Sequence, residues 1–66
     1  MPKIFVDYTL IGHARRFSMP VKSRVRCELH NGDTVIVFGD DVPEARARVL
    51  SVSANTADVE FELLDA

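Results

Sequence analysis

The stretch that decides the predicted fold runs from Val21 to Phe38 and reads VKSRVRCELHNGDTVIVF. Asn31-Gly32 is the preferred pair for a two-residue type I′ turn, because both positions of that turn need positive φ angles. Apolar and polar side chains alternate before and after this pair, as expected of half-buried strands. The sequence therefore predicts a β-hairpin over residues 21–38.

The register of this hairpin predicts two different faces. A two-residue turn sets Cys27 opposite Ile36 and Val25 opposite Phe38, which gives one apolar face. The other face brings basic residues beside Val35 and Val37. We expect either a further element of the fold or a partner molecule to cover these two valines. A lone hairpin is marginally stable in water, so other strands must pack against it.

The N-terminal segments predict one strand and one loop. Residues 3–11, KIFVDYTLI, are rich in β-branched and aromatic side chains and predict a first strand. Both of its faces carry apolar residues, so we expect it to be central or covered on both sides. Residues 12–20 begin with glycine and end with proline, which predicts a loop, with a short helical turn as an alternative.

The C-terminal half predicts a second hairpin. Strands over residues 46–53 and 58–64, joined by a turn at Asn55-Thr56, place Val52 opposite Val59 and Leu50 opposite Phe61. A competing signal is a capping box at residues 41–44, which favours a helix over about residues 42–51. The sequence thus predicts an all-β, five-stranded small barrel, with an α+β fold containing that helix as the alternative.

Length and composition limit the class of protein. A chain of 66 residues, 47% hydrophobic and 27% charged, is expected to form a single globular domain over residues 1–66. Its one cysteine excludes an internal disulfide and suits a reducing compartment. There is neither an apolar run long enough to span a membrane nor a signal-peptide pattern, so we expect a cytoplasmic protein without membrane contact.

A resemblance to a known family covers about half of the chain. Residues 32–39, GDTVIVFG, followed by Ala47-Arg48-Val49, resemble the KOW-type motif of small SH3-like barrels. Ala47 stands where the motif has a glycine, and acidic residues at 40, 41 and 44 replace the basic residues usual around its turn. The resemblance therefore implies an SH3-like barrel more than an RNA-binding role. It also implies that residues 12–20 lie where such barrels often contact ligands.

The sequence predicts no catalytic residue, cofactor or metal site. His13 and His30 lack cysteine or histidine neighbours at metal-ligand spacing. Cys27 is predicted to lie on the apolar face of its strand as a small hydrophobic residue. No phosphate-binding glycine loop or serine nucleophile motif occurs. We therefore expect a protein that is not an enzyme.

Charge is distributed unevenly along the chain. The net charge is −2, but residues 1–30 hold six basic and two acidic side chains, whereas residues 31–66 hold two and eight. The two halves either neutralise each other in the fold or leave a basic face that attracts an anionic partner. Two alternating charge strips, at residues 22, 24 and 26 and at residues 58, 60 and 62, allow both outcomes.

These observations predict a small non-enzymatic binding module, most simply a protein-interaction or accessory domain with an unknown protein partner. One alternative is RNA or DNA backbone binding through a basic face, with aromatic stacking. The other is homo-oligomerisation by pairing of strand edges. The candidate contact residues are Tyr8, Arg15, Arg16, Phe17, Lys22, Arg24, Arg26, Val35 and Val37.

Overall fold

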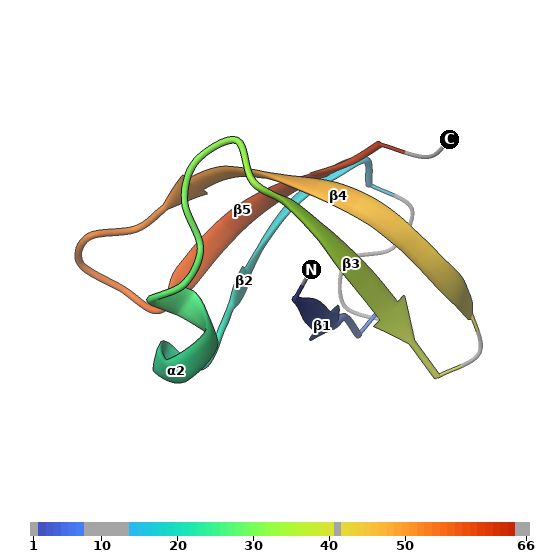
Figure 1. Ribbon diagram of the computed structural model, residues 1–66, viewed down its shortest axis with the longest axis horizontal. Helices are drawn as coiled ribbons and strands as arrows, with labels where there is room; N and C mark the ends of the chain where they lie inside the picture. Colours follow the sequence, from blue (N-terminus) through green and yellow to red (C-terminus); the bar gives the residue numbers. More distant parts are fainter. Residues whose placement is uncertain (1, 8–13, 41, 65–66) are drawn as a thin grey trace.

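A computed structural model describes residues 2–7, 14–40 and 42–64 of the chain. These residues form five strands and one short helix: β1 (Lys3–Phe5), β2 (Arg16–Pro20), α2 (Ser23–Arg26), β3 (Thr34–Gly39), β4 (Val42–Val52) and β5 (Asp58–Leu63). The strands make one sheet in the order β1-β3-β4-β5-β2, which curls into a half-barrel (Figure 1). The prediction of an all-β, five-stranded fold is confirmed.

The core fills the inner side of this curled sheet. Phe61 on β5 has no exposed surface, and its ring lies 5.6 Å from that of Phe17 on β2. Alternate residues of each strand point inward, as the period of two requires. The buried residues are Ile4, Val6, Phe17, Val21, Leu29, Val35, Val37, Ala47, Val49, Val59 and Phe61. Every strand therefore contributes to a single core.

The predicted hairpin over residues 21–38 is wrong in its first half. Residues 21–30 form no strand, and Ser23–Arg26 form the helix α2. Val21, Val25 and Leu29 recur every four residues, a spacing that fits a helical turn as well as alternation in a strand. The structure buries Val21 and Leu29 and half-buries Val25, whereas Cys27 is exposed. The prediction of a buried Cys27 is therefore also wrong.

Asn31-Gly32 does form a turn, but one of a different type. Gly32 has a φ of 91°, and no other described residue has a positive φ, so the turn is not type I′. The His30 N–H donates to Asp33 Oδ2 at 3.0 Å, and the Asp33 N–H donates back to the His30 carbonyl. The Gly32 N–H donates to the carbonyl of Val49 at 2.7 Å. The turn therefore leads from α2 into β3 and is attached to β4.

This change reverses the two faces of β3. Val35 and Val37 have no exposed surface, whereas Ile36 and Phe38 are only half-buried. An element of the fold therefore covers the two valines. The predicted core face of β3, with Ile36 and Phe38, is wrong by one residue, because the hairpin that set its register does not form.

The two N-terminal segments also differ from prediction. In the described part of residues 3–11, only Lys3–Phe5 form a strand, and β1 is an edge strand rather than a central one, with Phe5 47% exposed. Residues 8–11 lie outside the described residues. In the predicted loop over 12–20, Arg16–Pro20 form β2, paired antiparallel with β5.

The C-terminal hairpin is confirmed, with a bulge that the sequence did not indicate. Val52 pairs with Val59 as predicted, but Phe61 pairs with Val49 instead of Leu50. The register shifts between Val49 and Ser51, which leaves Leu50 as the extra residue. Residues 42–52 are strand throughout, so the alternative helix over 42–51 is wrong.

The bulge can be tested by one pair of isosteric substitutions on β4. Val49→Thr is expected to lower the free energy of unfolding by about 1–3 kcal/mol, because it buries a hydroxyl in the core. Val42→Thr makes the same change at a position that is 39% exposed and is expected to cost less than about 0.5 kcal/mol. Urea-induced unfolding measures the free energy of unfolding of both variants. Equal losses would contradict the register that turns Val49 toward the core.

The turn before β3 gives a second test. Gly32→Ala is expected to cost about 1–2 kcal/mol of unfolding free energy, because an L residue is strained at positive φ. No atom lies within 4 Å of the added methyl group, so the cost is conformational rather than steric. Gly32→Asn is the matched variant and is expected to lose less, since asparagine tolerates positive φ better. If urea unfolding shows that Gly32→Asn is less stable than Gly32→Ala, this explanation is excluded.

Candidate functional site

The half-barrel leaves two strand edges unpaired by the sheet, and the first is that of β1. The Val6 N–H donates to the carbonyl of Phe38 at 2.8 Å, which places even-numbered residues of this segment toward β3. In a parallel ladder, the residues between them direct their backbone groups to the opposite edge. Lys3 and Phe5 therefore present N–H and C=O groups on the free side of β1. No partner for these groups lies among the described residues.

The second edge belongs to β2. The Val21 N–H donates to the carbonyl of Ala57 at 3.0 Å, so the odd-numbered residues here face β5. Arg16, Ser18 and Pro20 consequently direct their backbone groups away from the sheet. Pro20 has no N–H to offer, and proline is a common means of keeping an edge strand from pairing. The free edge of β2 is therefore weakened at the end that leads into α2.

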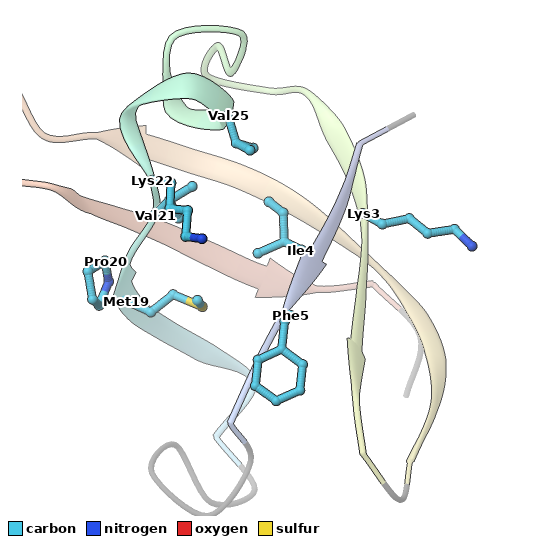
Figure 2. A pocket seen from close by; sticks show the side chains of 8 residues that line it. All are labelled: Lys3, Ile4, Phe5, Met19, Pro20, Val21, Lys22 and Val25. Atoms are coloured by element: carbon cyan, nitrogen blue, oxygen red, sulfur yellow. The ribbon is translucent and has the colours of Figure 1, made fainter.

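An apolar hollow of about 320 Å³ lies between these elements. Figure 2 shows the side chains of Ile4 and Met19 directed into it, with Val25 of α2 at one end. Its lining residues come from β1, from the end of β2 and from the segment that leads into α2. They are Lys3, Ile4, Phe5, Met19, Pro20, Val21, Lys22 and Val25. We refer to this feature as the edge hollow.

The charged groups at the edge hollow are both cationic. Lys3 Nζ is 3.0 Å from Glu44 Oε2, and Figure 2 shows this amine directed away from the edge hollow. The amine of Lys22, by contrast, extends toward the space between Val21 and Ile4 (Figure 2). Lys22 is exposed and has no ion pair among the described residues. Within the part of the chain that the structure describes, the edge hollow thus combines an apolar floor with the ammonium group of Lys22 at its mouth.

The α2 segment is held in place by one arginine. The Arg26 side chain donates from Nη1 to the carbonyl of Val21 at 2.6 Å, in a partly buried contact. The backbone N–H of Arg26 also donates to the carbonyl of Lys22 at 2.8 Å. The side-chain bond joins the short helix to Val21, next to the end of β2, whereas the backbone bond closes the first turn of the helix itself. The first of these bonds therefore holds Val25 and Lys22 beside the edge hollow.

The predicted basic residues fall into two groups at opposite ends of β2. Arg15 Nε donates to the carbonyl of Leu63 at 3.3 Å, and Arg16 Nε lies 3.1 Å from Glu62 Oε2. Lys22, Arg24 and Arg26 follow the other end of the strand. The alternating strips of residues 22–26 and 58–62 do not face each other as paired strands, since the first is helical.

The predicted apolar contact residues are core residues. Val35 and Val37 have no exposed surface, so the expectation that they contact a partner is wrong. Phe17 is 7% exposed and packs on Phe61, so it is also a core residue. Tyr8 lies outside the described residues. The residues that line the edge hollow instead include Ile4, Met19 and others that sequence reasoning assigned to a strand face or a loop.

The signal that could have located this site was Pro20. A proline that ends an apolar-polar alternation is as typical of an edge strand as of a loop. Interpreted that way, Arg16 to Pro20 would have predicted an edge with Met19 and Phe17 on its inner face.

Comparison with protein-family models, with curated proteins and with solved structures finds no match to this chain. The described residues contain no group of three or more histidine, cysteine or carboxylate side chains arranged to hold a metal ion. They also contain no helix with the length and apolar character needed to cross a membrane. The geometry of the edge hollow is therefore the basis for a functional proposal.

The positioning role of Arg26 is testable. Arg26→Gln is expected to lower the free energy of unfolding by roughly 1–2 kcal/mol, because it removes a charged donor from a partly buried carbonyl. Arg24→Gln removes the same charge from an exposed residue of the same helix and is expected to cost less than about 0.5 kcal/mol. Urea unfolding of the two variants compares them. If the two substitutions lower the free energy of unfolding by the same amount, the side chain of Arg26 does not hold α2 in place.

Proposed function

We propose that this chain is a small non-enzymatic binding module that takes a segment of a partner protein into the edge hollow. The observation that carries the proposal is the incomplete closure of the barrel. Among the described residues, two strand edges have no partner beside an apolar hollow, and such edges are the usual sites at which extended peptides are recognised. The resemblance to KOW-type barrels stays a prediction, and the proposal does not depend on it.

The alternatives draw less support from the geometry. Backbone binding of nucleic acid needs several available cations on one face. Arg16 pairs with Glu62, and Arg26 is committed to the carbonyl of Val21. Homo-oligomerisation would use the same free edges as a peptide. Both alternatives are outcomes of the experiments below.

A peptide library tests the proposal. We expect a phage-displayed library of random dodecapeptides to yield binders to the wild-type chain. Val25→Trp, which fills the edge hollow, is expected to yield none of these binders, whereas Ser23→Trp, an exposed change on the same helix, is expected to retain them. The chain has no other tryptophan, so a blue-shifted emission of Val25→Trp reports that the indole occupies the edge hollow. If both variants select the same peptides, the edge hollow is excluded as the binding site.

Two further measurements separate the alternatives. Fluorescence anisotropy with mixed-sequence single-stranded RNA and DNA at two salt concentrations detects nucleic-acid binding. Salt-sensitive binding that the double variant Arg15→Ala/Arg16→Ala weakens would favour that function instead. Light scattering after size exclusion detects self-association, and a dimer that Val25→Trp abolishes would assign the edge hollow to a second copy.

A further inference from the structure

The size of the edge hollow limits what enters it. A volume of about 320 Å³ lies at the lower end of the range for ligand sites. That space suits one or two apolar side chains rather than the face of a helix. Ile4, Met19, Val21 and Val25 give it an apolar floor. The occupant therefore contributes an apolar side chain from an extended segment as its anchor, rather than the apolar face of a helix.

The two strand edges differ in their capacity to pair with such a segment. The free side of β1 presents both donors and acceptors at Lys3 and Phe5. The free side of β2 lacks a donor at Pro20. An added strand therefore pairs with β1. Its residue opposite Ile4 directs its side chain to the same face as Ile4, which is the face of the edge hollow.

The charges at the mouth select the residues beside the anchor. Among the described residues, the lining contains two lysines and no carboxylate. Lys22 has a flexible amine with no ion pair among those residues, placed at the mouth of an apolar site. A carboxylate next to the anchor would pair with it, whereas a lysine there would be repelled.

From these three steps we infer the chemistry of the partner, on the basis of the function proposed above. The partner segment is an extended, acidic-apolar peptide that adds to the free edge of β1. It inserts one apolar side chain into the edge hollow and places a flanking carboxylate beside Lys22. Backbone pairing supplies affinity, and Lys22 supplies selectivity for acidic sequences.

Three fluorescein-labelled, amidated nonapeptides test the charge pattern by anisotropy. One alternates glutamate with valine, one alternates lysine with valine, and one has the composition of the first with its glutamates and valines in separate blocks. We expect only the acidic alternating peptide to bind, at least about tenfold more tightly than the other two. Equal binding of the lysine or block peptide would overturn the inferred pattern.

A matched pair of protein variants tests the role of Lys22. Lys22→Glu is expected to weaken binding of the acidic peptide about tenfold, because it replaces an attraction with a repulsion. Arg24→Glu makes the same change in net charge on a residue outside the edge hollow and is expected to change binding less than about twofold. Equal effects of the two variants would assign the selectivity to net charge and overturn the role of Lys22.

Backbone methylation tests strand addition. Two forms of the acidic peptide carry N-methyl groups on either the glutamates or the valines. An added strand uses the N–H groups of only one set, so one form is expected to lose binding while the other keeps it. Equal effects in the two forms would overturn pairing with β1.

The failures of the two proposals are distinguishable. Some library peptides could bind to the wild-type chain and not to Val25→Trp, yet lack alternating acidic residues. That result would overturn this inference but still support the proposed function. Absence of any binding that depends on the open edge hollow overturns both. A dimer at the concentrations used for anisotropy, lost in Val25→Trp, makes a second copy the occupant and overturns this inference.

Discussion

The bulge at Leu50 is the constraint on which the rest of the sheet depends. β4 pairs with both β3 and β5. The side chains of β4 that face inward therefore determine which side chains of β3 and β5 lie beside them in the core. With regular pairing from the turn, Arg48 would lie opposite Leu63 and face the core. The extra residue rotates the strand so that Ala47 and Val49 face inward, while Arg48 is exposed and lies opposite Glu62. A bulge also adds local twist and bend, which helps the sheet curl.

A sheet of this size must balance closure against access. A short chain gains little core and loses stability with every edge that it leaves exposed. Here the edges are managed unequally. Pro20 removes a backbone donor from the free edge of β2, β1 is only three residues long, and Ile4 and Val6 fix β1 to the core. Between β1 and β2 the described residues are joined by core side chains and not by a strand pairing, and the edge hollow lies between these two strands. The incomplete closure of the sheet therefore both forms the edge hollow and limits the stability of the fold.

The sequence predicted the fold class and the C-terminal hairpin because those depend on strong local signals: alternation around Val52, Val59 and Phe61, and turn residues between them. It failed at Val21 to Leu29 because apolar residues spaced by four satisfy two periods at once, and the Asn31-Gly32 pair favoured the wrong one. The edge hollow could not be derived, since it forms between β1 and the end of β2, and only tertiary packing brings these together. Lys22 was among the predicted contact residues, but as part of a basic surface and not as a cation beside an apolar site.

The pairing of β1 with β3 has a consequence for how the chain reaches this structure. Lys3 pairs with Ile36 and Arg16 with Glu62, so both edge strands join partners distant in sequence, whereas β3, β4 and β5 pair with their immediate neighbours in the chain. Closing long loops costs entropy before any contact repays it. We therefore expect the three-stranded meander to form first and the two edge strands to add late. Core substitutions in β4 should slow refolding, whereas those in β1 should chiefly speed unfolding, a contrast that stopped-flow kinetics can measure.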